Sequence, residues 1–174
     1  TATIWMQLDQ PAQVNLLHEQ ISSFSQPTDA LSENAFTVEF EIENLEPGTE
    51  YDYNIDIQGA ENSVSEGHRF KTQSLWQYRT DPPKFKVALG SCTYINEAKY
   101  DRPGEPYGRG YHIFNSIADK SPDMMLWLGD NIYLREPDWS SRSGYLHRYS
   151  HTRQTPEMQR LLKTGQHYAI WDDH

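Results

Sequence analysis

Three apolar runs of the sequence end in side chains that bind metal ions or transfer protons. The run FKVALGSC ends at Cys92, and the run DMMLWLGDNIY carries Asp130 and Tyr133. The third run, HYAIWDDH, ends in two aspartates and a histidine at residues 172–174. A thiolate, a phenolate and several carboxylates together suit a highly charged cation. Each run alone is a weak signal, since free cysteines are often buried and most tyrosines only pack, but their coincidence predicts a metal centre.

The spacing of these runs indicates how a fold would bring them together. About 40 residues separate successive runs, which is room for one crossover helix with extra loop. Helical spacing occurs in the intervals, in GYHIFNSIADKSP and in SGYLHRYSHTRQTPEMQRLLKTG. Apolar runs that alternate with helices are typical of a parallel or mixed sheet, in which ligands bind beyond the carboxyl ends of the strands. We therefore expect residues 85–92 and 124–129 to be neighbouring strands, and Tyr168–Trp171 to be a buried strand.

Residues 1–75 follow another pattern, in which apolar and polar residues alternate. AFTVEFEIENL and EYDYNIDIQ each place four apolar side chains on one face, GHRFKTQ reads as a last short strand, and ATIWMQL and QVNLLHEQI read as a first hairpin. Period-two alternation between turn signals predicts a small β-sandwich. The stiff pair Pro82-Pro83 favours a connector over residues 76–84. The second domain is then expected over residues 85–174.

The stretch NLEPGTEYDYNI resembles a turn of fibronectin type III domains. In that turn a tyrosine corner would be formed by four residues, Leu45, Pro47, Gly48 and Tyr51. The resemblance covers most of residues 1–75 and implies a fibronectin type III-like β-sandwich. Another small β module is the alternative.

Composition narrows the classes of function. The chain has 174 residues, with 25 acidic against 15 basic and a net charge of −10, which argues against a nucleic-acid-binding footprint. No apolar stretch approaches the roughly 18 residues of a membrane span. The single cysteine forms no internal disulfide. No signal peptide is visible and no Met begins the chain, so we expect that Thr1 is not the native N-terminus.

The motifs ALGSC, LWLGDNIY and AIWDDH together resemble the PhoD-like alkaline phosphatases of the calcineurin-like metallophosphoesterase superfamily. The helical stretch before the third motif and the small β domain in front match the family as well. The resemblance implies a layered β-sandwich flanked by helices, with iron(III) and calcium at the active site. It implies hydrolysis of phosphomonoesters or phosphodiesters by a secreted or periplasmic enzyme.

The resemblance also implies a role for individual residues. Cys92 and Tyr133 would be iron ligands, Asp130 would bridge the metals and take part in catalysis, and Asp173 would be a further metal ligand. His174 would stabilise the transition state or protonate the leaving group. Two other residues, Asp172 and Asn131, would lie beside the ligands and support them.

The family pattern continues past the point where this sequence ends, with an acidic residue and later Asn and His ligands. We therefore expect the sequence to be part of a longer protein and to be inactive as a phosphatase by itself. The alternative function is a non-catalytic binding or adhesion module built on the fibronectin-like domain.

Several further residues stay open. Three arginines are candidates to clamp phosphate, and nothing in their spacing singles one out: Arg109, Arg135 and Arg142. His147 and His151 share a helix face but are by default polar surface residues. Trp139 is a candidate to line a substrate entrance, whereas Trp171 is expected to pack in a core or at the domain interface.

Overall fold

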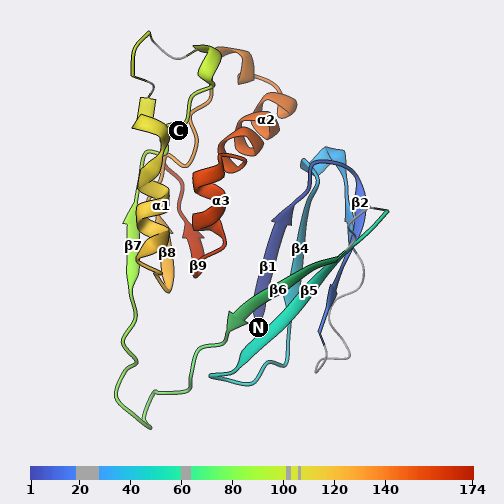
Figure 1. Ribbon diagram of the computed structural model, residues 1–174, viewed down its shortest axis with the longest axis vertical. Coiled ribbons are helices and arrows are strands. Elements are labelled where there is room, and N and C mark those ends of the chain that lie inside the picture. Colours follow the sequence, from blue (N-terminus) through green and yellow to red (C-terminus); the bar gives the residue numbers. More distant parts are fainter. Residues whose placement is uncertain (19–27, 60–63, 101–102, 106) are drawn as a thin grey trace. The chain divides into compact units, whose positions relative to one another are not determined.

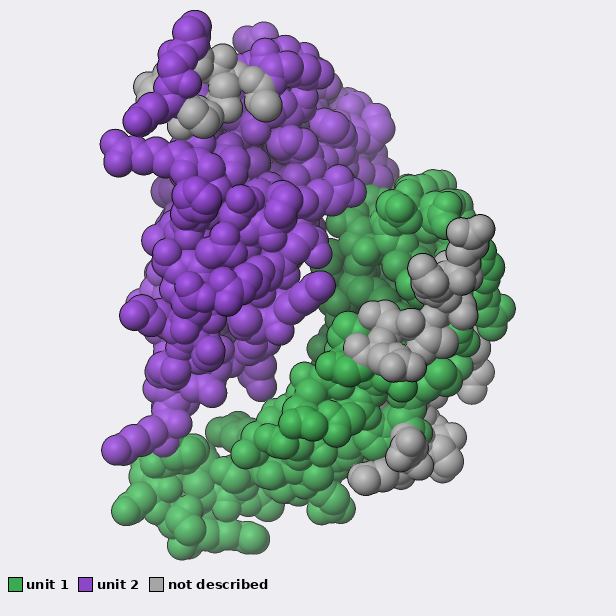
Figure 2. Space-filling view, viewed as in Figure 1, with its two compact units in different colours: residues 1–83 green, residues 84–174 purple. Residues whose placement is uncertain are grey.

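The computed structural model describes residues 1–18, 28–59, 64–100, 103–105 and 107–174. The chain divides into two compact units, residues 1–83 and 84–174 (Figure 2). Among the described residues, no helix has both the length and the apolar character needed to cross a membrane.

The first unit consists of short antiparallel strands in two sheets (Figure 1). The strands are β1 (Ala2–Gln7), β2 (Ala12–Leu17), β3 (Thr28–Ala30), β4 (Thr37–Ile42), β5 (Glu50–Gln58) and β6 (Val64–Lys71), with a 3₁₀ turn at Ser32–Asn34. One sheet has the order β1-β4 and the other β3-β2-β5-β6. Val14 and Leu16 of β2 share one buried cluster with Val38, Phe40 and Ile42 of β4, so the two sheets form a sandwich.

The predicted hairpin between the first two strands is wrong. β1 pairs with β4, whereas β2 pairs with β3 and β5. The link between β1 and β2 contains Pro11, which has no N–H to donate to a ladder, and the chain passes there from one sheet to the other. The end of the predicted second strand, residues 19–21, lies outside the described residues.

Tyr51 occupies the position that the turn pattern predicts. Its side chain is 6% exposed, and its hydroxyl accepts a hydrogen bond of 2.7 Å from the backbone N–H of Glu46. The ring stacks on Phe70 with 5.3 Å between centroids. A buried ring that fixes the chain five residues earlier is the geometry of a tyrosine corner. The wider likeness to fibronectin type III domains stays a prediction.

The second unit is a parallel α/β layer. Its strands are β7 (Val87–Gly90), β8 (Met124–Trp127) and β9 (Gln166–Ala169), and its helices are α1 (His112–Asp119), α2 (Arg142–Arg153) and α3 (Pro156–Leu162). Single 3₁₀ turns lie at Ala98–Tyr100, Tyr107–Gly110 and Glu136–Asp138. The sheet order is β7-β8-β9, with all strands parallel (Figure 1). The prediction that residues 85–92 and 124–129 hold neighbouring strands is confirmed.

The helices cover one face of this sheet. Phe114 and Ala118 of α1 pack with Met158 and Leu161 of α3, and Trp127 of β8 lies against this cluster. Side chains alternate between the two faces along a strand, so Trp127 and every second residue before it in β8 face the helices.

The other face of the sheet is open in the described part of the chain. Register places Leu89, Leu126 and Tyr168 in one row on it, and Leu89 and Tyr168 are 63% and 55% exposed. Ile170 is exposed as well, and Trp171 is 87% exposed. The expectations that Tyr168–Trp171 is buried and that Trp171 lies in a core are therefore wrong. Within the described part of the chain, this strand is covered on one face only.

Candidate metal centre

The three polar ends meet at the carboxyl edge of the parallel sheet. Backbone pairing continues past the strands, since Leu128 N–H donates to the carbonyl of Gly90 at 2.7 Å and Ile170 N–H to that of Trp127 at 3.0 Å. Beyond this, Thr93 N–H donates to the carbonyl of Asp130 at 2.8 Å. The segments that carry the predicted ligands are thus held side by side by backbone hydrogen bonds. This is the arrangement expected for a ligand site in a parallel sheet.

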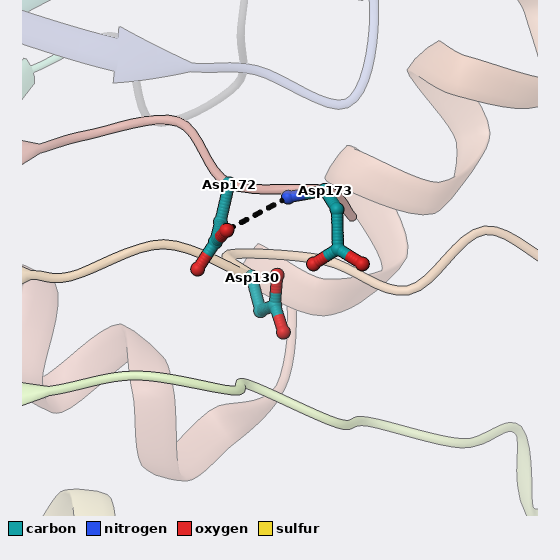
Figure 3. Close-up of side chains that lie close together, drawn as sticks. All are labelled: Asp130, Asp172 and Asp173. Atoms are coloured by element: carbon teal, nitrogen blue, oxygen red, sulfur yellow. Dashed lines mark hydrogen bonds between the residues drawn. The ribbon is translucent and has the colours of Figure 1, made fainter.

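Three carboxylates come together at this edge (Figure 3). The three residues are Asp130, Asp172 and Asp173, and one carboxylate oxygen of each lies within 4.8 Å of one carboxylate oxygen of both others. Asp130 is 8% exposed, whereas the other two are exposed. The backbone N–H of Asp173 donates to Asp172 Oδ1 at 3.0 Å, which orients that carboxylate. Such a group of oxygens can hold a cation.

Asp130 is the residue on which the other predicted ligands converge. The hydroxyl of Tyr133 donates to Asp130 Oδ2 at 2.9 Å, and Cys92 Sγ lies 3.5 Å from the same oxygen as its donor. The backbone N–H of His174 donates to Oδ1 at 3.3 Å. The hydrogen bond from Tyr133 lowers the pKa of Asp130, burial opposes it, and Cys92 and His174 add to the lowering. The lowered pKa keeps the Asp130 carboxyl in its ionised form, the form in which a carboxylate can bind a metal ion.

The phenol of Tyr133 keeps its proton in this arrangement. Its pKa is raised first by the hydrogen bond with Cys92, then by burial and by the Asp130 carboxylate. Its ring also lies 4.8 Å from the ring of His174, centroid to centroid. The sequence-predicted residues Cys92, Asp130, Tyr133, Asp173 and His174 are thus brought into one cluster.

The backbone at this edge is in unusual conformations. Cys92 and Asp130 have φ values of 60° and 48°, in the left-handed region that non-glycine residues rarely occupy. Gly129 between the strand and Asp130 has φ 97°, and a Cβ there would lie 2.5 Å from Cβ of Asp172. Only glycine allows the third segment to approach so closely. Strained residues of this kind cluster at functional sites.

Asn131 ties the second segment to the third. Its Nδ2 donates to the carbonyl of Ile170 at 3.0 Å, two residues before Asp172. The family resemblance implied that Asn131 lies beside the predicted ligands, and this hydrogen bond holds it against the third segment.

An aromatic wall adjoins the cluster, and sequence reasoning missed it. The ring of Tyr94 lies 5.2 Å from that of Tyr133 and 5.4 Å from that of Tyr107, centroid to centroid. The guanidinium of Arg135 lies 4.2 Å from the centroid of Tyr94. The sequence contained one signal for Tyr94, which is that a tyrosine follows closely after each of two predicted ligands. Tyr94 lies two positions after Cys92, and Tyr133 lies three positions after Asp130.

A buried ion-pair group braces the two loops that carry these residues. Arg148 of α2 donates from Nε to Asp138 Oδ2 at 2.8 Å and from Nη2 to Glu97 Oε1 at 3.3 Å. Arg148 and Asp138 are 2% and 3% exposed. Glu97 lies in the loop after β7, and Asp138 in the loop after β8. His147 Nε2 also lies 3.3 Å from Glu97 Oε1, so this histidine belongs to the brace.

The other residues that stayed open are distinguished by their surroundings. Arg109 forms an exposed ion pair with Glu105 at 3.6 Å. Arg142 is the first residue of α2. The ring of His151 lies 6.0 Å from that of His147, and burial lowers its pKa, helped by the charge of Arg148. Trp139 is exposed in the loop before α2.

Two solved structures, that of PhoD and that of a purple acid phosphatase, have a fold similar to that of this chain. The structure of PhoD matches 99% of this chain with a TM-score of 0.69 and 19% identity, and this chain covers 36% of it. Purple acid phosphatase PPD1, isolated from seeds of yellow lupin (Lupinus luteus), matches 99% of this chain with a TM-score of 0.57 and 13% identity, with 33% of it covered. The chain thus spans about a third of the length of each.

Comparisons at the level of sequence are less informative. A family model described as a domain of unknown function, DUF7800, matches residues 1–75. No curated protein matches the sequence. The likeness to PhoD and to the lupin enzyme therefore shows the fold, and the chemistry is argued from the residues.

Proposed function

We propose that the protein is a metal-dependent hydrolase of phosphomonoesters, phosphodiesters or both, of the alkaline phosphatase type to which PhoD belongs. The observation that carries this proposal is the convergence of Cys92 and Tyr133 on the ionised Asp130 carboxylate, with Asp172 and Asp173 beside it. The PhoD-like fold and the motif resemblance support it.

The donor set fits the proposed metals. Cys92, Asp130, Tyr133 and Asp173 would hold them, and a thiolate with a phenolate favours iron(III) over magnesium or calcium alone. Carboxylate oxygens suit calcium as the second ion. When bound, such a metal pair polarises phosphoryl oxygens and lowers the pKa of water.

The protein's own residues have separate tasks in this proposal. Asp130 draws the donors of two loops together, and Asn131 holds the third segment in reach of it. His174 follows Asp173 directly and its ring contacts that of Tyr133, which supports the proposal that its imidazole stabilises the transition state or protonates the leaving oxygen. By the same resemblance we propose that the enzyme is secreted or periplasmic.

Hydrolysis of p-nitrophenyl phosphate and bis(p-nitrophenyl) phosphate at alkaline pH tests the proposal. The whole gene product, supplied with iron and calcium, should hydrolyse at least one of them. Asp130→Asn should abolish turnover and iron retention. Asp81→Asn is the control: it alters an exposed aspartate that is distant from Asp130 in the sequence, and it should change neither turnover nor iron retention. A protein that retains no iron and hydrolyses neither ester would instead support the alternative of a binding module.

A further inference from the structure

Arg135 differs from the other arginines around the site in how its charge is compensated. Its Nη2 donates to Asn96 Oδ1 at 3.3 Å, and its guanidinium lies over the ring of Tyr94. Within the described ranges no carboxylate pairs with it. Arg148, by contrast, pairs with two carboxylates. A partly buried guanidinium that lacks an anion offers N–H donors to a ligand.

The position of Arg135 is fixed from two sides. Its backbone N–H donates to Asp138 Oδ2 at 2.8 Å, the oxygen that also accepts from Arg148 Nε. Arg148 also donates to Glu97, and Glu97 lies in the same loop as Tyr94. The ring under the guanidinium and the backbone behind it are therefore held by the same buried brace, so the guanidinium needs little reordering to bind an anion.

Arg135 lies beside the metal centre without being part of it. The guanidinium contacts the ring of Tyr94, Tyr94 contacts Tyr133, and Tyr133 donates to Asp130, so these contacts connect Arg135 to that carboxylate only through two aromatic rings. If the phosphoryl group binds at the three carboxylates, Arg135 is available to bind another part of the same substrate. Tyr94 is 38% exposed, which leaves this wall open to a ligand.

We propose that Arg135 binds a second phosphate of the substrate, apart from the phosphoryl group that is hydrolysed. The inference rests on the proposed phosphoesterase function and narrows its substrate class to phosphate esters with a second phosphate. Guanidinium groups bind phosphate through paired N–H donors. The chain has a net charge of −10, so a doubly charged substrate needs such local compensation.

A matched pair of substrates tests this: hexyl phosphate and the bisphosphate of hexanediol, with the metal-loaded whole gene product. The wild type should favour the bisphosphate in kcat/KM by about tenfold, the usual contribution of a charge-assisted contact. Arg135→Gln should remove this preference through KM and leave hexyl phosphate almost unchanged. Arg135→Lys should keep part of the preference, because the charge remains. Arg109→Gln is the control, since that arginine is exposed and paired with Glu105.

The outcomes separate the two proposals. If the wild type hydrolyses neither of these esters nor either p-nitrophenyl ester, the proposed function is overturned and this inference with it. If it hydrolyses only bis(p-nitrophenyl) phosphate, this inference alone is overturned. Hydrolysis of both hexyl phosphate and the bisphosphate, with the same preference in wild type and Arg135→Gln, overturns the inference alone. An equal loss on both esters together with loss of bound iron would show that Arg135 only supports Tyr94 and Tyr133, and would also overturn it.

Discussion

The phenol of Tyr133 donates a hydrogen bond of 2.9 Å to Asp130, three residues earlier in the same loop. Burial of Asp130 alone would raise its pKa, and this hydrogen bond outweighs that effect. The loop therefore holds an ionised carboxylate before any cation binds, and the proton that a cation would displace lies on the phenol.

Tyr133→Phe should abolish the phenolate band in the visible absorption spectrum of the iron-loaded protein. The proposed band arises from charge transfer between the phenolate and iron(III), and phenylalanine has no oxygen to supply it. Absorption spectroscopy with iron content measured on the same sample checks this. Tyr168→Phe, on the open face of the sheet, is the control and should keep the band. An unchanged spectrum in Tyr133→Phe would show that this tyrosine is not a ligand.

Gly129→Ala should weaken metal binding strongly. A Cβ at this position would lie 2.5 Å from Cβ of Asp172, so the third segment has to move away from Asp130. Gly104→Ala is a matched control, because its φ of 102° is close to the 97° of Gly129 and its Cβ would meet no atom within 4 Å. Both variants carry the strain of a positive φ, which costs about 1 kcal/mol or more. Isothermal titration with metal should show the loss in Gly129→Ala only.

Arg148→Met should destabilise the second unit by about 3–5 kcal/mol, because it leaves the buried Asp138 carboxylate without its cation and removes one partner of Glu97. Asp138 and Arg148 side chains are 4% and 3% exposed. Chemical denaturation measures the change. Arg160→Met is the control: it removes an exposed ion pair with Asp119, worth about 1 kcal/mol at most. Equal losses in the two variants would contradict the prediction.

Glu97 predicts how the stability of this brace depends on pH. The pKa of Glu97 is lowered from 4.5 to about 2, chiefly by its hydrogen bond with His147 against the effect of burial, with Lys99 and Arg148 contributing. Because the folded pKa lies below the unfolded one, the contribution is complete above about pH 4.5 and is lost as pH falls towards about 2. The difference in Tm between wild type and Glu97→Gln should shrink over that range. Glu136→Gln, an exposed glutamate of the neighbouring loop, should show no such trend.

Local patterns in the sequence predicted every strand except β3, the helices between the parallel strands and the meeting of the three polar ends. The strands and helices depend on residues close together in the chain, and the meeting of the polar ends follows because parallel strands end at the same edge of a sheet. Strand partners in the first unit were harder, because the same alternation allows β1 to pair with β2 or with β4. Periodicity also could not show whether the run before Trp171 is covered on both faces or on one.

The brace around Arg148 was beyond sequence reasoning for a related reason. Glu97 lies 51 positions before Arg148, and Asp138 lies 10 before it. A charged residue on a helix is by default a surface residue. Only the packing of α2 against both loops makes this arginine a buried partner of two carboxylates. The Tyr94–Arg135 contact likewise depends on tertiary packing.

The left-handed backbone conformation at Cys92 lowers the stability of the fold, whereas the thiol of this residue would contribute to metal binding. Cys92 is exposed with φ 60°, so its side chain adds little packing and its backbone carries strain. Cys92→Gly should therefore raise the Tm of the metal-free protein, since glycine adopts this conformation without strain that costs other residues about 1–2 kcal/mol. The same substitution should weaken iron binding. By stability alone glycine would be the better residue at position 92, and the cost of cysteine there is one that metal binding would offset.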